Sequence, residues 1–256
     1  MEEIRAVVLD LDGTLLNIRG HISNENMVYL KKLSKKGIKI YIATGRGADA
    51  FGIIKDIPCD GIVLNNGLQA YYGNRLVWKK QLEKRELIYF WDSMKDMGIE
   101  IGTYIEEGLC KSIMNREGIS SSYQLCDEIP ECFAKMFVKI NKSVNIEMIK
   151  ERVPDGYYII FSRDGYGFIL PDGISKYSSL KKIIEFDGIH MEQIIAFGDD
   201  QSDKELIEKC GIGVAMGNAL KDVKNIAKFV TKSNERNGII YMLEHLEAGG
   251  IIKAID

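Results

Sequence analysis

The chain lacks the charge surplus and the long apolar runs that would indicate a nucleic-acid-binding or membrane protein. Its 34 Lys and Arg residues are balanced by 37 Asp and Glu residues, which gives a formal net charge of −3. This balance argues against a general nucleic-acid-binding surface and against an anchor to anionic membranes. No run approaches the 18 consecutive apolar residues of a transmembrane helix. The residues after Met1 lack the apolar segment of a signal peptide, so we expect a cytoplasmic protein.

Cysteine and histidine are also sparse, which bears on metal and disulfide chemistry. The five cysteines are odd in number and include no CxxC pair, so neither a disulfide framework nor a zinc site is expected. Buried thiols in a reducing compartment are the prediction for Cys59, Cys110, Cys126, Cys132 and Cys210. The three histidines, His21, His190 and His245, lie in unrelated segments and are not predicted to be ligands.

What the chain does contain is a series of short apolar runs over 256 residues, long enough for a substantial core. Continuous apolarity is typical of parallel strands that are buried on both faces. Helical patterns with polar caps separate several of these runs, and such alternation predicts a doubly wound, Rossmann-like α/β fold. The predicted strands are 6–13, 38–45, 61–67, 193–200, 211–218 and 227–231, and the predicted helices are 24–37, 203–210 and 219–227.

The pattern changes to α+β in the middle of the chain. Helices are expected at 86–98 and 143–153, with strands at 101–105, 134–140, 157–161 and 167–170 and a hairpin turn around 162–165. We therefore predict a Rossmann-like α/β core formed by 1–80 and 172–256, with an inserted α+β domain at 81–171, which the family resemblance described below implies to be a cap that sets substrate specificity. There is no internal repeat and no low-complexity segment.

Polar residues follow the predicted core strands where those strands end. Ligands of open parallel sheets bind at the carboxyl ends of the strands. The residues at these ends are Asp10 and Asp12, then Thr44, Gly45 and Arg46, then Asn65 and Asn66, and finally Asp199, Asp200 and Asp203. We expect them to meet at one edge of the sheet.

Such a group of carboxylates requires a positive partner. Two carboxylates about 4 Å apart repel by roughly 4 kcal/mol at an effective dielectric constant near 20. An all-oxygen set without histidine suits a hard cation, and a few carboxylates with waters suit Mg²⁺. A metal beside a carboxylate nucleophile is typical of aspartyl-phosphate chemistry. Thr44 with the Gly45 amide offers phosphate donors, and Lys176 offers a compact positive charge.

These motifs, in this order, resemble the haloacid dehalogenase-like hydrolases, specifically the Cof-type phosphatases with a large cap. The resemblance rests on DLDGTLL at 10–16, ATGR at 43–46, Lys176, GDDQSD at 198–203 and GVAMGNA at 213–219, and it covers essentially the whole chain. It implies Asp10 as nucleophile and metal ligand, and Asp12 as general acid/base that offers its backbone carbonyl to the metal.

The resemblance implies further roles around these two residues. Asp199 would complete the metal shell and Asp203 would support it. Phosphate would be bound by the backbone at Leu11 and by Thr44, Gly45 and Lys176. Ser202 stands where the family commonly has Asn, and its hydroxyl can also donate to phosphate.

Other interpretations of the same residues remain open. Asp10 and Asp12 could belong to an ordinary turn, and Asp200 could be a loop carboxylate. Turn or cap positions would also explain Asn65, Asn66 and Asn218, and Arg46 could be an exposed surface charge. The predicted function is a Mg²⁺-dependent phosphatase of a small phosphorylated metabolite, a sugar phosphate or similar phosphomonoester, acting through an aspartyl phosphate. A phosphomutase on the same scaffold and a non-catalytic phosphoacceptor or metabolite-binding protein are the alternatives. The substrate and the oligomeric state stay open.

Overall fold

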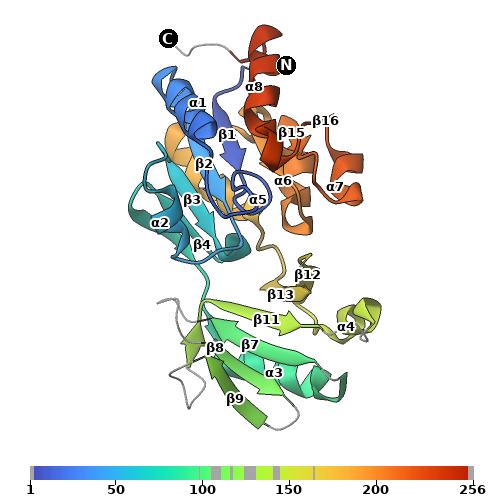
Figure 1. Ribbon diagram of the computed structural model, residues 1–256. Helices are drawn as coiled ribbons and strands as arrows, with labels where there is room; N and C mark the ends of the chain where they lie inside the picture. The colour runs from blue at the N-terminus through green and yellow to red at the C-terminus, as the bar shows by residue number, and fades with distance from the viewer. Residues whose placement is uncertain are drawn as a thin grey trace. The chain divides into compact units, whose positions relative to one another are not determined.

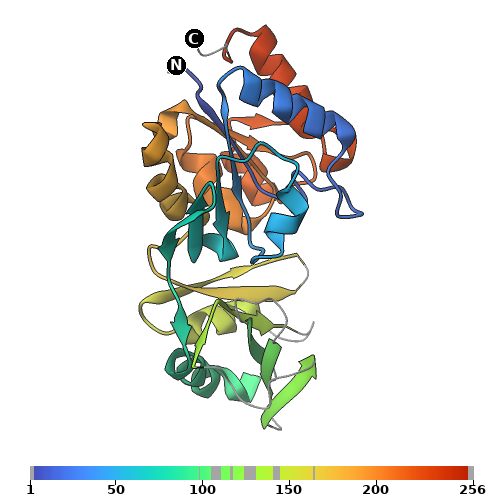
Figure 2. The same cartoon turned by 90° about the vertical axis from the view of Figure 1, so that its left-hand side faces the viewer.

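The computed structural model describes residues 3–97, 99–104, 111–115, 118–123, 131–140, 145–163 and 165–252, without the side chains of 111–115 and 118–123. The chain forms two compact units (Figures 1 and 2). The first comprises Met1–Arg46, Ala50–Trp78 and Ser175–Asp256, and the second Gly47–Asp49 and Lys79–Ile174. The described residues do not include Cys110 and Cys126. They also omit the last residue of the helix predicted at 86–98, the last residue of the strand predicted at 101–105, the first two residues of the helix predicted at 143–153 and one residue of the hairpin turn predicted at 162–165.

The first unit is built on one eight-stranded sheet with the order β16-β15-β14-β1-β2-β3-β4-β5. Every pair from β16 to β3 is parallel, and β4 joins β3 antiparallel. The strands are β1 (Ala6–Leu9), β2 (Lys39–Ala43), β3 (Gly61–Leu64), β4 (Gln69–Tyr72), β5 (Arg75–Lys79), β14 (Ile194–Gly198), β15 (Ile212–Ala215) and β16 (Phe229–Val230). The six predicted core strands all belong to this sheet, and the α/β prediction is confirmed.

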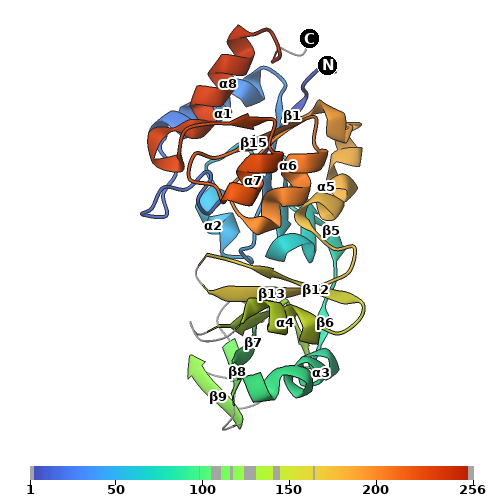
Figure 3. The same ribbon diagram turned by 90° about the vertical axis from the view of Figure 1, so that its right-hand side faces the viewer.

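Helices cover both faces of this sheet, which explains why its strands are continuously apolar. On β1, Val7 and Leu9 enter the core cluster that includes α1 (Asn24–Lys35) and α8 (Gly238–Ala248), whereas Ala6 and Val8 enter the cluster that includes α5 (Lys176–Ile184). Helices α1 and α8 lie against each other (Figure 3). The helices of this unit are α1 (Asn24–Lys35), α2 (Ala50–Ile54), α5 (Lys176–Ile184), α6 (Lys204–Lys209), α7 (Lys221–Ile226) and α8 (Gly238–Ala248).

Short 3-10 turns connect several of these elements. They are η1 (Asn65–Gly67), η3 (Glu185–Asp187), η4 (Met191–Gln193), η5 (Gln201–Asp203) and η6 (Asn234–Arg236). The predicted cap of α1 is present, since the Ser23 hydroxyl accepts a hydrogen bond from the backbone N–H of Asn26 at 3.1 Å.

The second unit contains a six-stranded antiparallel sheet with the order β12-β13-β11-β7-β8-β9. Its strands are β7 (Glu100–Tyr104), β8 (Lys111–Asn115), β9 (Gly118–Tyr123), β11 (Lys135–Lys139), β12 (Tyr157–Phe161) and β13 (Tyr166–Pro171). Strands β6 (Leu82–Glu83) and β10 (Cys132–Phe133) form a separate pair, and the helical elements are α3 (Lys84–Met94), η2 (Lys95–Met97) and α4 (Ile146–Arg152).

Two expectations need correction. The sequence did not predict six of the strands: β4 and β5 of the first unit, β8 and β9 at one edge of the six-stranded sheet, and the separate pair β6 and β10. The prediction of buried thiols holds for Cys210 but is wrong for Cys132, which is exposed, while Cys59 is partly exposed. Among the described residues, no helix combines the length and apolarity needed to cross a membrane.

Candidate active site

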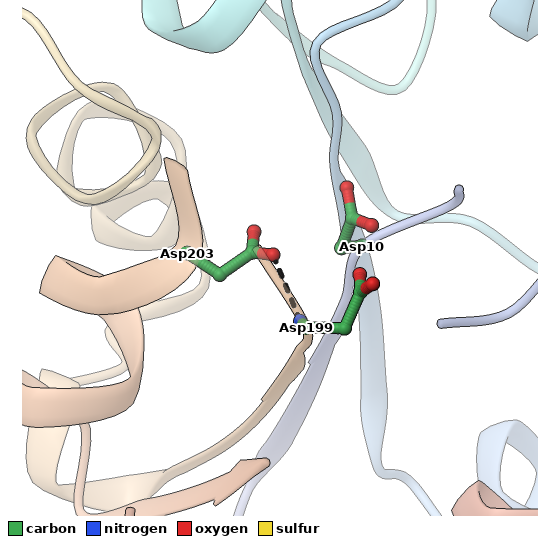
Figure 4. Close-up of side chains that lie close together, drawn as sticks. All are labelled: Asp10, Asp199 and Asp203. Carbon is green, nitrogen blue, oxygen red and sulfur yellow. Dashed lines mark hydrogen bonds between the residues drawn. The ribbon is translucent and has the colours of Figure 1, made fainter. Parts of the chain in front are cut away.

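The centre of the site is a group of three buried carboxylates at the ends of β1 and β14. The two strands are parallel, with Leu9 paired with Phe197, so Asp10, which follows β1, and Asp199, which follows β14, emerge at the same edge of the sheet. Asp203 lies at the end of η5, which begins two residues after Asp199. Oxygen atoms of all three carboxylates lie within 4.8 Å of one another (Figure 4).

Lys176 supplies the positive charge inside this group. It is the first residue of α5, whose N-cap is Ser175, and it is 2% exposed. Its Nζ lies 2.8 Å from Oδ1 of Asp10 and 2.7 Å from Oδ1 of Asp203. Burial works against the charged form, but attraction to Asp10 and Asp203 outweighs it and raises the pKa of Lys176. The lysine is therefore held as a buried cation.

The pKa of Asp10 is shifted by burial and by the charges of its neighbours. Burial raises the pKa of its carboxyl well above the usual range, Lys176 works to lower it, and the negative charges of Asp203 and Asp199 raise it further. A second cation close to this group would favour the ionised form of Asp10 in the same way as Lys176 does.

Asp203 connects the carboxylate group to the backbone. Its Oδ2 accepts hydrogen bonds from the backbone N–H groups of Asp199 at 3.0 Å and Asp200 at 3.1 Å. The approach is close, because a Cβ added at Gly198 would lie 2.4 Å from the Cβ of Asp203. Asp203 thus fixes the strand end that carries Asp199.

The turn after β1 also contacts the side chain of Asp199. Thr14 Oγ1 donates to Oδ1 of Asp199 at 3.1 Å, and Asn218 Nδ2 donates to the carbonyl of Gly13 at 2.7 Å. Gly13 has a φ of +81°, and a Cβ there would lie 2.3 Å from Oδ2 of Asp199. Sequence reasoning did not assign Thr14 to the site and treated Asn218 as a turn or cap residue, although both lie within the motifs DLDGTLL and GVAMGNA.

Asp12 lies in a different environment from Asp10. Its side chain is 56% exposed and forms a two-point ion pair with Arg46, from Nε to Oδ2 at 2.7 Å and from Nη2 to Oδ1 at 2.6 Å. Its carboxylate does not belong to the group formed by Asp10, Asp199 and Asp203. Arg46 is thus the partner of Asp12 and not only an exposed surface charge. A predicted metal contact through the backbone carbonyl of Asp12 stays a prediction.

The segment after β2 is held by a left-handed turn. Thr44 is fully buried, its Oγ1 accepts from the backbone N–H of Arg46 at 3.1 Å, and its carbonyl accepts from Asn66 N–H at 3.1 Å. Asn65 N–H donates to the carbonyl of Arg46 at 2.8 Å. Asn65 and Asn66 have φ values of +51° and +56°, a costly conformation for residues other than glycine. This turn was expected, but its bracing of Thr44 and Arg46 was not.

The same turn also reaches the start of α5. Gly67 has a φ of +108°, and a Cβ there would lie 2.3 Å from the carbonyl oxygen of Ser175, the residue before Lys176. At Gly45, an added Cβ would lie 2.9 Å from Oδ1 of Asn66. Close packing at these two glycines therefore links the segment that carries Thr44 to the helix that carries Lys176.

The two remaining predicted residues lie in the turns around the carboxylates. Leu11 is fully buried, and its carbonyl accepts from Thr14 N–H at 3.3 Å and from Leu16 N–H at 2.8 Å. Ser202 is partly exposed and occupies the middle of η5, one residue before Asp203. Their predicted phosphate contacts stay predictions.

The carboxylate group fits a hard metal ion. It offers oxygen donors alone, and neither histidine nor cysteine belongs to it in the described part of the chain. Three carboxylates beside one lysine leave an excess of negative charge in a buried place, which is costly without a further cation or protons. Asp10 and Asp199, at adjacent strand ends, are the side chains best placed to share such an ion.

Comparison with known proteins identifies the family. The model of the haloacid dehalogenase-like hydrolases matches residues 7–243. The chain is 26% identical to the phosphoglycolate phosphatase of Sulfolobus acidocaldarius, over 97% of this chain and 99% of the relative. It is 25% identical to the 5-amino-6-(5-phospho-D-ribitylamino)uracil phosphatase YwtE of Bacillus subtilis, over 96% and 99% of the two chains.

A solved structure agrees with this assignment at the level of the fold. The fold resembles that of BT1666 from Bacteroides thetaiotaomicron, with a TM-score of 0.83, 24% identity, and coverage of 98% of this chain and 96% of that one. The chain therefore belongs to the haloacid dehalogenase-like hydrolases and is a Cof-type phosphatase that acts on phosphorylated substrates.

Proposed function

We propose that the protein is a Mg²⁺-dependent phosphatase that hydrolyses a small phosphorylated metabolite through an aspartyl phosphate on Asp10. The observation that carries the proposal is the buried contact of Lys176 with Asp10 and Asp203 beside Asp199. A carboxylate nucleophile, a fixed ammonium group and an all-oxygen metal site are the parts that this reaction needs. The predicted cytoplasmic location stays a prediction.

Asp10 acts as the nucleophile. One of its carboxylate oxygens forms a bond to phosphorus while the bond from phosphorus to the ester oxygen breaks. Lys176 holds Oδ1 of Asp10 at 2.8 Å, which fixes the orientation of the carboxylate and places a positive charge next to the entering phosphate. Mg²⁺, bound by Asp10, Asp199 and the backbone carbonyl of Asp12, would reduce the repulsion between carboxylate and phosphate.

Asp12 acts as the general acid and then as the general base. It gives a proton to the departing ester oxygen, and in the second step it takes a proton from the water that attacks the aspartyl phosphate. That attack forms a bond from the water oxygen to phosphorus and returns Asp10 as a carboxylate. Arg46 holds the Asp12 carboxylate at two points and so limits its orientations.

The transferring phosphate is bound by groups at the strand ends. The Thr44 hydroxyl, the backbone N–H groups at Gly45 and Leu11, Lys176 and the Ser202 hydroxyl donate to its oxygens. Asp203 acts indirectly, because it fixes Lys176 and the backbone of Asp199. We assign substrate selection to the inserted cap, residues 81–171. The names of the two relatives support a small phosphomonoester as the substrate class.

The test combines a substrate panel with two variants. Purified protein is assayed for released inorganic phosphate with Mg²⁺, after exhaustive chelation, and after Mg²⁺ is restored. Asp10→Asn should eliminate turnover of every ester. Asp12→Asn should slow the phosphorylation step of alkyl phosphates more than that of aryl phosphates in single-turnover kinetics, because acid assistance of about 10²- to 10⁴-fold matters most for poor leaving groups.

Three results would contradict the proposal. These are full turnover in chelator, near-parent activity of Asp10→Asn, and transfer of phosphate to a second sugar without release of free phosphate. Equal losses for alkyl and aryl esters in Asp12→Asn would remove Asp12 from the acid role.

A further inference from the structure

The turn after β15 is fixed by its backbone beside the strand end that carries Asp199. Strand β15 lies next to β14 in the sheet, and this turn, residues 216–220, follows it. The backbone N–H of Met216 donates to the carbonyl of Gly198 at 3.0 Å. The backbone N–H of Leu220 donates to the carbonyl of Asp199 at 2.9 Å. The position of the turn relative to the end of β14 is therefore set at both ends of the turn.

Asn218, in the middle of this turn, contacts the two segments that carry the proposed metal ligands. Its Nδ2 donates to the carbonyl of Gly13 at 2.7 Å, and it lies 3.5 Å from Oδ2 of Asp199. Gly13 follows β1, and β14 lies between β15 and β1 in the sheet. The Asn218 side chain therefore spans the end of β14 and joins the turn after β15 to the turn after β1.

A second asparagine fixes the orientation of the Asn218 amide. The backbone N–H of Asn234 donates to Oδ1 of Asn218 at 3.0 Å. The amide oxygen only accepts and the amide nitrogen only donates, so this contact directs Nδ2 toward Gly13 and Asp199. Nδ2 of Asn234 in turn donates to the carbonyl of Leu16 at 2.8 Å. Asn218 and Asn234 thus hold the turn after β1 at two carbonyls, and we call this pair the asparagine bridge.

The asparagine bridge extends the link between β1 and β14 beyond their paired residues. The backbone N–H of Asp10 donates to the carbonyl of Phe197 at 3.2 Å, at the end of the parallel register. Past this point, Oγ1 of Thr14 donates to Oδ1 of Asp199 at 3.1 Å, and Asn218 contacts Oδ2. The Asp199 carboxylate is therefore held at one oxygen by Thr14 and at the other by Asn218.

An ordinary turn residue would not need these contacts. Turn asparagines bond to backbone groups within their own turn or adopt a left-handed conformation. The hydrogen bonds of the Asn218 side chain go to Gly13, Asp199 and Asn234, each of which is 16 or more residues away in the chain. Asn218 is also not among the described non-glycine residues with a positive φ. Its contacts therefore indicate a role between segments and not within its own turn.

The spacing between these segments determines which cation the site prefers. Asp10 and Asp12 belong to the segment that leads into Gly13, whereas Asp199 follows β14. Mg²⁺ requires oxygen ligands at about 2.0–2.1 Å in near-octahedral geometry, whereas Ca²⁺ accepts about 2.3–2.6 Å and a less regular geometry. A fixed, narrow spacing therefore favours Mg²⁺, and a looser spacing lowers the affinity for Mg²⁺ more than the affinity for Ca²⁺.

We propose that Asn218, supported by Asn234, is a positioning residue that fixes the spacing between Asp10 and Asp199 and so gives the site its preference for Mg²⁺ over Ca²⁺. The asparagine bridge acts through the backbone of the turn after β1 and through the Asp199 carboxylate. This inference rests on the proposed Mg²⁺-dependent function and adds to it the residues that select the ion by its size.

The first experiment measures binding without turnover, by calorimetric titration of the full chain with Mg²⁺ and, separately, with Ca²⁺. Asn218→Ala should raise the dissociation constant for Mg²⁺ by roughly tenfold. The constant for Ca²⁺ should rise by no more than about threefold, because Ca²⁺ tolerates irregular geometry. Asn74→Ala is the matched control, since Asn74 is exposed in the turn between β4 and β5. This control should leave both constants within about twofold.

Two further variants separate the asparagine bridge from the turn itself. Serine also suits turns, but its hydroxyl is too short to contact Gly13 and Asn234 together. Asn218→Ser should therefore shift the ratio of the two dissociation constants as Asn218→Ala does. Asn234→Ala keeps the backbone donor to Asn218 and loses the contact with Leu16, so its effect on Mg²⁺ should be smaller, about threefold. These variants keep the proposal testable if Asn218→Ala does not fold.

The second experiment follows hydrolysis of p-nitrophenyl phosphate over a range of Mg²⁺ concentrations. Asn218→Ser should raise the Mg²⁺ concentration needed for half-maximal activity by roughly tenfold. The KM for the ester, measured at saturating Mg²⁺, should stay within about twofold, because the altered contacts act on the metal site. A general loss of structure would not produce this division between the two parameters.

The outcomes distinguish this inference from the proposed function. A parent protein that binds no Mg²⁺ would contradict the proposed Mg²⁺-dependent function and with it the inference. A parent that binds Mg²⁺, with Asn218→Ser binding both cations in the parent's ratio, would overturn the inference alone. Equal losses of affinity for Mg²⁺ and Ca²⁺ would assign Asn218 a purely structural role and also overturn it.

Discussion

Replacing Lys176 with methionine should strongly destabilise the protein, because it leaves a buried group of carboxylates without its ammonium partner. Oxygens of Asp10, Asp199 and Asp203 lie within 4.8 Å of one another. At that separation and an effective dielectric constant near 20, one pair of unit charges repels by about 3.5 kcal/mol. Breaking a buried ion pair by removal of one partner costs about 3–5 kcal/mol. The total stability of a folded protein is only about 5–15 kcal/mol.

We therefore expect Lys176→Met to lower the free energy of unfolding by about 3–5 kcal/mol. The measurement is urea unfolding at pH 7 in the presence of chelator, followed by circular dichroism. Lys181→Met is the matched control, since Lys181 lies on the same helix and is exposed. This control should change the free energy of unfolding by no more than about 0.5 kcal/mol.

Two further measurements separate charge from packing. The double variant Lys176→Met/Asp203→Asn should recover part of the loss, because it removes one charge while the asparagine oxygen still accepts from the backbone of Asp199. Mg²⁺ should stabilise Lys176→Met more than it stabilises the parent, because a bound cation then replaces the missing ammonium charge. A loss in Lys176→Met no larger than in Lys181→Met would refute the electrostatic reasoning.

Three other predictions follow from single contacts. Gly13→Ala should weaken Mg²⁺ binding, measured by calorimetric titration, because the added Cβ would lie 2.3 Å from Oδ2 of Asp199. Gly20→Ala is the control for the backbone cost, since Gly20 also has a positive φ, +74°, but no neighbour within 4 Å. Equal Mg²⁺ affinities of the two variants would contradict the steric argument. Asp199→Asn should raise the Mg²⁺ concentration needed for half-maximal activity, because one charge leaves the site while its shape stays; an unchanged requirement would remove Asp199 from the metal site. Hydrogen bonds from Lys36, together with those from Tyr29 and Lys32, lower the pKa of Glu247 to about 2. The parent should therefore have a larger free energy of unfolding than Glu247→Gln at pH 7, and this difference should decline as the pH falls from about 4.5 to about 2. Urea unfolding at several pH values measures this difference, and a difference that does not change with pH would contradict the assignment.

The six parallel strands of the core sheet, from β16 to β3, were predictable because burial on both faces leaves a direct mark on the sequence. In β1, Ala6 and Val8 contact one core cluster and Val7 and Leu9 contact the other, so every position is apolar. Parallel strands covered by helices on both sides require this composition. The same logic predicted that Asp10 and Asp199 would meet, since both directly follow such strands.

Strands β8 and β9, which were missed in the second unit together with the short pair β6 and β10, lacked such a mark. Strand β8 reads KSIMN and β9 reads GISSSY, and both are rich in polar residues. Strand β9 lies at the edge of the antiparallel sheet and β8 lies next to it, and backbone pairing of this kind places few demands on side-chain composition. Their place depends on neighbours such as β7, which no local pattern in these segments specifies.

The different environments of Asp10 and Asp12 depend on contacts that spacing in the sequence does not encode. The Asp10 side chain is 6% exposed and contacts the ammonium group of Lys176, whereas the Asp12 side chain is 56% exposed and contacts the guanidinium group of Arg46. The second contact exists because β1 and β2 are neighbours, with Leu9 opposite Ile42, so that the segments following both strands start at the same edge of the sheet. The motif DLDGTLL therefore places Asp10 and Asp12 near one site. It does not show that each carboxylate contacts a different cation, because those contacts depend on the order of the strands in the sheet. Because Arg46 is also tied through its backbone to Thr44 and Asn65, the position of the Asp12 carboxylate is coupled to the segment proposed to bind phosphate.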